Sequence, residues 1–164
     1  MSPLDTSGAR PTDQLVAWSF VAVQLALIAA VFFLPGGSDW TAPNWLSTAA
    51  LTLQVVSTVV LLVAAVSLGR SLTPLPTPAA AGTLRTGGLY RFVRHPIYTG
   101  LMGLAIGEAV GSGSVAVSVA ALALIGWLML KARWEERMLA DRFEDYREYA
   151  SRTPRFIPFW PAHR

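Results

Sequence analysis

Apolar residues are gathered into long runs along this chain, and charged residues lie between and after these runs. Residues 15–34 form one run, interrupted only by Ser19 and Gln24, and residues 45–68 form another with scattered Ser, Thr and Gln. About 20 apolar residues in a helix cross a bilayer core of about 30 Å. The two runs are therefore predicted to be membrane-spanning helices.

A third apolar stretch, residues 97–130, has a Gly-Ser-Gly-Ser segment near its centre at positions 111–114. Clustered Gly and Ser favour a turn. We therefore predict two short helices, residues 97–110 and 115–130, each about 21–24 Å long at about 1.5 Å per residue. One long kinked helix is the alternative.

Charged residues are almost absent from these runs. Asp39 is the only one in residues 14–68, and Glu108 is the only one in residues 95–130. The chain is 53% hydrophobic and only 14% charged, against a usual charged share of about 25%, which excludes an ordinary soluble domain and a disordered chain. The absence of Cys excludes disulfide and zinc-thiolate scaffolds, and two His are few for a metal site, so we expect no metal.

The basic residues fall on one side of the membrane if the chain has four spans. Residues 69–96 carry four Arg, residues 131–164 carry eight Lys or Arg, and the other two connections carry none. Lys and Arg favour the cytoplasmic side, so both termini, the connection 69–96 and the tail 131–164 are predicted to be cytoplasmic. Arg outnumbers Lys twelve to one, as in GC-rich bacteria, so we expect a protein of the bacterial inner membrane. We expect no nucleic-acid partner.

The tail is predicted to form an amphipathic helix, because its apolar residues recur at helical spacing. These residues are Met138, Leu139, Phe143, Tyr146 and Ala150. Pro154 would end the helix, and residues 155–160 are typical of an interfacial anchor that folds back on the membrane. The expected fold class is all-α, a polytopic membrane helical bundle of about four transmembrane helices plus this cytoplasmic helix, in a single domain over residues 1–164.

Candidate chemistry lies at two membrane boundaries. Pro96 disfavours a helical conformation at His95 and suits the first turn of the third helix. Arg94 and His95 are thus predicted to lie on a constrained turn before a helix N-terminus, which favours an anionic group such as a carboxylate. Glu135 and Glu136 follow the fourth apolar run, where a carboxylate needs a cationic partner. Arg94, His95, Arg133 or a cationic ligand could supply it.

Several segments together match a known family. They are Gly88-Leu89-Tyr90, Arg94-His95-Pro96-Ile97-Tyr98-Thr99-Gly100, Glu135-Glu136-Arg137-Met138-Leu139, Tyr146, Tyr149, Pro154 and Pro158. The chain resembles, over about residues 83–158, the isoprenylcysteine carboxyl methyltransferase and phospholipid methyltransferase-like group of integral membrane enzymes.

The resemblance implies a helical membrane enzyme that uses S-adenosylmethionine, held in a cytoplasm-facing pocket. The cofactor contacts that it implies are Thr83, Leu84, Tyr90, His95, Pro96, Ile97, Tyr98 and Glu135. Lys131, four positions before the first Glu, stands where the family has a basic residue linked to the substrate, and we place Arg133 on the same side. This chain has Lys131 where Arg is usual and Gly82 where many relatives have His.

The function we expect is methyl transfer to a hydrophobic or lipid-like acceptor that enters from the bilayer. Arg94, or backbone N–H groups near Pro96, would bind the cofactor carboxylate. Glu135 would bind its ammonium, and Tyr90, Tyr98 or Trp134 would cover the adenine. A thiolate or carboxylate acceptor needs no base, whereas an amine or hydroxyl acceptor needs one. The catalytic candidates are Arg94, His95 and Glu136.

A small four-helix transporter is the alternative, because Glu108 is the only ionisable residue predicted within the hydrocarbon region and could bind a cation or proton. The oligomeric state stays open, since the short third and fourth helices could pack against a second copy.

Overall fold

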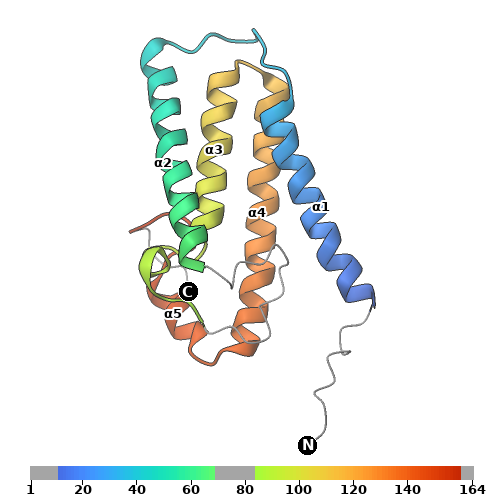
Figure 1. Cartoon of the computed structure of the whole chain (residues 1–164), viewed down its shortest axis with the longest axis vertical. Coiled ribbons are helices and arrows are strands. Elements are labelled where there is room, and N and C mark those ends of the chain that lie inside the picture. The colour runs from blue at the N-terminus through green and yellow to red at the C-terminus, as the bar shows by residue number, and fades with distance from the viewer. Residues whose placement is uncertain (1–10, 69–83, 160–164) are drawn as a thin grey trace, which may run out of the picture.

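The computed structural model describes residues 11–68 and 84–159, with side chains from Trp18 onward, and contains no strand in these ranges. Four long helices run up and down beside one another (Figure 1). They are α1 (Pro11–Phe33), α2 (Asn44–Leu68), α3 (Pro96–Ser112) and α4 (Val115–Arg142). A 3-10 turn, η2 (Gly88–Arg91), and the short α5 (Tyr146–Arg152) lie at the end of the bundle where α3 begins. The all-α fold class is confirmed.

A turn separates α3 from α4 at the Gly-Ser segment, so the alternative of one kinked helix is wrong. Gly113 adopts a left-handed conformation with φ 60°, which side chains with a Cβ rarely tolerate. Ser114 then caps α4, since its hydroxyl accepts a hydrogen bond from the Val117 amide at 3.5 Å.

The connection between α1 and α2 holds this turn in place. The amides of Gly37 and Asp39 donate to the carbonyls of Ser112 and Gly113 at 2.9 and 3.0 Å. The Asp39 carboxylate accepts from the Val115 amide at 2.8 Å, a favourable place for an anion at the start of α4. Asp39 is thus a structural residue at the end of the bundle opposite α5.

Small residues allow α2 and α3 to approach closely, as is common between membrane helices. Gly100, Gly103 and Gly107 lie along the face of α3 that meets α2. A Cβ on Gly100 would lie 2.9 Å from the carbonyl oxygen of Ser57 and 3.0 Å from the Cβ of Leu61. The backbones therefore set the distance between these helices.

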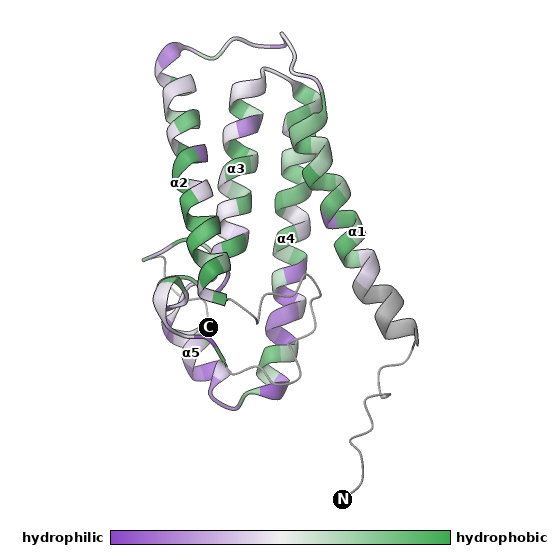
Figure 2. Cartoon of the chain, viewed as in Figure 1, coloured by the Kyte–Doolittle hydropathy of each residue, from purple (hydrophilic) through white to green (hydrophobic). Residues whose placement is uncertain are grey.

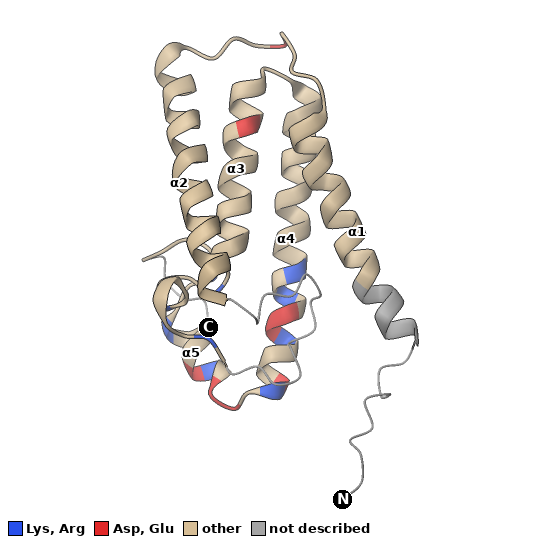
Figure 3. Ribbon diagram, in the orientation of Figure 1, with Lys and Arg blue, Asp and Glu red and all other residues tan. Residues whose placement is uncertain are grey.

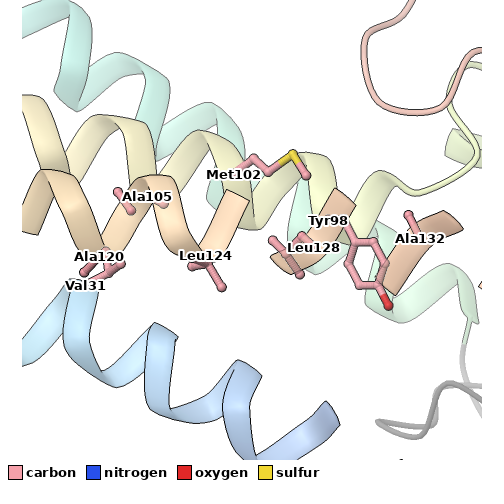
Figure 4. Close-up of a cluster of buried hydrophobic side chains, with 9 residues drawn as sticks. Val31, Tyr98, Met102, Ala105, Ala120, Leu124, Leu128 and Ala132 are labelled. Atoms are coloured by element: carbon pink, nitrogen blue, oxygen red, sulfur yellow. The ribbon is translucent and has the colours of Figure 1, made fainter. Parts of the chain in front are cut away.

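The remaining core runs along α3, α4 and the end of α1 (Figure 4). Its buried side chains are Val31, Tyr98, Met102, Ala105, Ala120, Ala121, Leu124, Leu128 and Ala132. The row ends at Tyr98 and Ala132 (Figure 4), and Ala132 directly follows Lys131, the first charged residue of α4. The core thus leads directly to the polar end of the bundle.

Large apolar side chains are also exposed on the outside of the bundle, and hydrophobic residues make up most of the length of the long helices (Figure 2). On α2 they recur every three or four residues at Leu51, Val55, Val59, Leu62 and Val66, each more than half exposed. Among the described residues, α2 and α4 are long and apolar enough to cross a membrane, and the apolar part of α1, Trp18–Phe33, is shorter. An apolar exterior of this extent belongs in lipid, which agrees with a helical membrane protein.

The amphipathic tail helix is present in two pieces, and its boundaries differ from those expected. Residues 131–142 continue α4 without a break, and α5 forms a separate helix after Phe143. No Gly or Pro occurs in residues 131–142, so the end of the apolar run does not end the helix. Charged residues gather on this extension and on α5 (Figure 3).

We predict that Gly100→Ala lowers the thermal stability of the purified protein, because the added methyl group forces α2 and α3 apart. The cost should be about 1–3 kcal/mol of unfolding free energy. Gly126→Ala is the matched control, because a Cβ on Gly126 meets nothing within 4 Å. Equal unfolding temperatures for the two variants would contradict the close approach.

Candidate active site

His95 lies at the N-cap of α3, held by the residue that follows it. Pro96 is buried in the first turn of α3, and His95 takes a non-helical conformation with φ −126° and ψ 63°. Its side chain makes no capping hydrogen bond. The expected turn at Arg94 and His95 is therefore present, and both side chains are 9% exposed.

Tyr98 brings the start of α3 into contact with α4. Its hydroxyl donates to Glu135 Oε1 at 2.6 Å, and the other oxygen of Glu135 lies 3.8 Å from His95 Nδ1. The rings of His95 and Tyr98 are parallel, with their centroids 5.3 Å apart. Burial raises the pKa of the Glu135 carboxyl, and His95, Tyr98 and Lys131 oppose that rise. Two segments that are far apart in sequence thus meet at one half-buried carboxylate.

Glu136 lies at the centre of a group of basic side chains. Arg155 donates to its two oxygens, from Nε to Oε1 at 2.8 Å and from Nη2 to Oε2 at 2.5 Å. His95 Nε2 and Arg94 Nε lie 3.2 and 3.5 Å from Oε1. Burial raises the pKa of Glu136, but the hydrogen bonds of His95 and Arg155 and the charge of Arg94 outweigh it and lower the pKa to about 2. Glu136 is therefore ionised at neutral pH.

The tail returns to the same place through its backbone. The amides of Arg94 and His95 donate to the carbonyls of Pro154 and Arg155 at 2.9 and 3.1 Å. The Thr99 hydroxyl donates to the carbonyl of Phe156 at 2.9 Å. The tail segment 153–156 is thereby fixed across the start of α3.

The two residues expected on the substrate side, Lys131 and Arg133, lie in different surroundings. Lys131 is buried in α4, its Nζ donates to Gln24 Oε1 on α1 at 2.7 Å, and it lies 5.6 Å above the ring centre of Tyr98. Arg133, two positions further on, points to another face of the helix and is exposed. The structure therefore brings Lys131 to the cluster but leaves Arg133 outside it.

The remaining cofactor-side candidates lie around η2. Tyr90 is buried, and its carbonyl accepts a hydrogen bond from the Tyr149 hydroxyl. Burial, with the nearby charge of Glu135, raises the pKa of Tyr90 to about 12. Ile97 packs against the core, and Thr83 lies outside the described residues.

Leu84 borders an open pocket of about 490 Å³ between η2 and α5. Thr86, Arg91, Asp145, Glu148, Tyr149, Arg152 and Thr153 complete its lining. Tyr90 thus approaches the cluster, whereas Leu84 lies toward this neighbouring pocket.

Two buried polar atoms near Glu136 have no hydrogen-bond partner among the described residues. They are Arg94 Nε and the Tyr146 hydroxyl. Buried polar groups normally find a partner, so such atoms point to a ligand or water. Arg94 Nε faces Glu136 Oε1 at 3.5 Å, beyond a good hydrogen bond, so its guanidinium is suited to a further carboxylate, and Glu135, whose side chain is 18% exposed, is suited to an ammonium group. The residues therefore fit an amino-acid moiety such as that of S-adenosylmethionine.

Sequence reasoning missed three contributors. Arg155 and Phe156 were expected in an interfacial anchor, yet Arg155 pairs with Glu136 and Phe156 packs on the His95 ring at a centroid distance of 5.9 Å. Gln24 was treated as a polar interruption of the first span, yet it contacts Lys131. The sequence does indicate that Glu136 needs cationic partners beyond the turn at Arg94 and His95. No sequence pattern near Glu136 identifies Arg155 as one of them.

Comparison with known proteins identifies the family of this chain. Residues 45–146 match the phospholipid methyltransferase family, which is more than half of the chain. The chain therefore belongs to this family of membrane methyltransferases.

Relatives of two kinds are similar to it. The cobalt-zinc-cadmium resistance protein CzcN of Cupriavidus metallidurans is 37% identical over 171 residues, covering 100% of this chain and 76% of that protein. Protein-S-isoprenylcysteine O-methyltransferase B of Arabidopsis thaliana is 32% identical over 141 residues, covering 82% and 69%. The nickel-cobalt-cadmium resistance protein NccN of Alcaligenes xylosoxydans xylosoxydans is 33% identical over 165 residues, covering 96% and 69%.

The depressed pKa of Glu136 predicts a pH dependence of stability. A carboxyl whose folded pKa lies below its unfolded value near 4.5 stabilises the fold at neutral pH, and loses that contribution as the pH falls from about 5 toward 2. At pH 7 the free energy of unfolding of wild type should exceed that of Glu136→Gln by about 2 kcal/mol. The difference in Tm between the two proteins should therefore narrow as the pH falls from about 5 to 3.

Tryptophan fluorescence of the proteins in detergent would follow their thermal unfolding at each pH. Glu144→Gln, at an exposed position, is the control and should track wild type. A gap between wild type and Glu136→Gln that stays constant from pH 7 to pH 3 would contradict the ion-pair assignment.

Proposed function

We propose that this protein is an S-adenosylmethionine-dependent methyltransferase that acts on a hydrophobic, lipid-like acceptor at the cytoplasmic face of the membrane. The observation that carries the proposal is the contact of Tyr98 with Glu135, which joins the start of α3 to α4 beside His95. Membership of a methyltransferase family supports the reaction class. The apolar exterior supports an acceptor that is dissolved in the bilayer.

Each end of the cofactor finds a matching group in this cluster. Glu135 would bind the ammonium, and Arg94 with the start of α3 would bind the carboxylate. Tyr90 and Tyr98 would cover the adenine, beside Pro96 and Ile97. Bound S-adenosylmethionine supplies an electrophilic methyl group.

The protein's contribution is mainly placement, because methyl transfer is an in-line displacement. The buried side chains of Tyr98 and His95 exclude water from the donor's side. For an amine or hydroxyl acceptor, His95 is the better general base. Glu136, whose pKa is about 2, binds protons too weakly for that role. Glu136 instead holds Arg94 and His95 in position.

The acceptor is proposed to reach Lys131 from the bilayer, between α1 and α4. Lys131 is the cation nearest the apolar part of α4, and its contact with Gln24 places it at the junction of these helices. By name, one relative acts on protein S-isoprenylcysteine, whose apolar chain fits this route. Arg133, which is exposed, has a weaker claim.

The orientation is proposed from charge. The basic residues of α4, α5 and the 84–94 segment lie at one end of the bundle, and this end is assigned to the cytoplasm of a bacterium (Figure 3). Both termini would then be cytoplasmic.

The transporter alternative has a single contact in its favour. Glu108, half-buried on α3, accepts a hydrogen bond from Gln54 Nε2 on α2 at 2.9 Å. This bond joins the two most closely packed helices, which is sufficient to explain a polar pair there. Two relatives carry metal-resistance names, but no group of three or more His, Cys, Asp or Glu in the described residues is placed to hold a metal ion.

Calorimetric titration of the detergent-solubilised protein tests the proposal. Wild type should bind S-adenosylmethionine, and Glu135→Gln should weaken binding at least tenfold, because an ammonium loses its charged partner. Glu144→Gln is exposed and should bind like wild type. A folded wild-type protein that shows no binding would sink the enzyme assignment.

Incubation of membranes with methyl-labelled cofactor identifies the acceptor. We expect label in an organic-extractable product, equally with wild type and with Glu108→Gln, because Glu108 lies far along α3 from His95. The transporter gains ground if neither protein yields product and Glu108→Gln alone abolishes cation efflux from loaded vesicles.

A further inference from the structure

Arg155 lies beyond residues 45–146, which match the family, yet it enters the centre of the proposed site. Its backbone position does not depend on its side chain. Main-chain and hydroxyl hydrogen bonds hold residues 154–156 against Arg94, His95 and Thr99. A substitution at Arg155 therefore removes the guanidinium while leaving the tail attached.

The guanidinium contacts Glu136 through two nitrogen atoms, at 2.8 and 2.5 Å. A bidentate pair fixes the plane of the carboxylate as well as its charge. The carboxylate is 11% exposed, and the Arg155 side chain is 31% exposed. The pair is therefore partly shielded from water, and hydrogen bonding to Glu136 raises the pKa of Arg155.

An oriented, ionised Glu136 determines which nitrogen of His95 carries the proton. Glu136 Oε1 lies 3.2 Å from Nε2, and a carboxylate can only accept there, so Nε2 must donate. In the neutral imidazole, Nδ1 is then an acceptor. Nδ1 lies on the other side of the ring, 3.8 Å from Glu135 Oε2.

We propose that Arg155 is a positioning residue, which acts through Glu136 to hold His95 as the Nε2–H tautomer with Nδ1 free to accept beside Glu135. The inference deepens the proposed function, on which it rests. In this tautomer Nδ1 is the nitrogen that can accept a proton, and it lies beside Glu135, the carboxylate proposed to bind the ammonium group. Phe156 packs on the same imidazole and limits its rotation.

Histidine NMR tests the inference without any turnover. The chain contains only two His, so ring-¹⁵N-histidine labelling gives two spin systems, and His163→Gln assigns them. Wild type near pH 8 should show His95 as the Nε2–H tautomer. Arg155→Gln should give a mixture of tautomers, and Arg155→Lys should be intermediate, because it keeps the charge but loses the fork.

Arg152→Gln is the matched control, since Arg152 is exposed and pairs with Glu148 on α5. It should leave the His95 signals unchanged. A folded Arg155→Gln protein whose His95 signals match those of wild type would overturn the inference. If Arg155→Gln does not fold, wild-type His95 signals in Arg155→Lys would overturn it instead.

Calorimetry separates this inference from the proposed function. Arg155→Gln should raise the Kd for S-adenosylmethionine about tenfold, with partial recovery in Arg155→Lys. A wild-type protein that binds no S-adenosylmethionine refutes the proposed function, whereas the tautomer result still decides the role of Arg155. Wild-type affinity in Arg155→Gln would refute a positioning role toward the cofactor.

Discussion

One buried carboxylate, Glu136, connects three parts of the chain: α4, the turn before α3 and the tail. A carboxylate with so little water around it is stable only with cations close by. Here they come from the turn before α3 and from the tail. Arg155 and His95 both contact Glu136. The same contacts that balance the charge of Glu136 therefore also set the positions of the side chains around it.

Placement at the end of the bundle follows from the helices. α3 starts at Pro96 and α4 crosses from apolar to charged residues after Leu130, so the two boundaries meet at the same level. Tyr98 and Glu135 touch because each lies within a turn or two of that boundary. The closely packed pair of α2 and α3 carries His95, while α1 contributes Gln24 from the other side.

Much of the fold could be predicted because it depends on local patterns. Apolar runs predicted the four long helices, the Gly-Ser segment predicted the turn at Gly113, and Pro96 predicted the non-helical conformation of His95. The continuation of α4 to Arg142 was missed, because the change to charged residues marks a change of surroundings, whereas helix termination needs a local breaker. The pairing of Arg155 with Glu136 depends on where the chain folds back, which no spacing between them reveals.

The glycine face between α2 and α3 affects how the protein adapts to bilayers of different thickness. Because these two backbones touch, main-chain contact fixes the depth of α3 relative to α2. The position of His95, at the start of α3, is therefore fixed relative to α2 as well. α1 has no comparable seam of glycines. When the hydrocarbon layer thickens or thins, tilting of α1 should absorb the mismatch, leaving the imidazole at a constant height relative to its partner carboxylates.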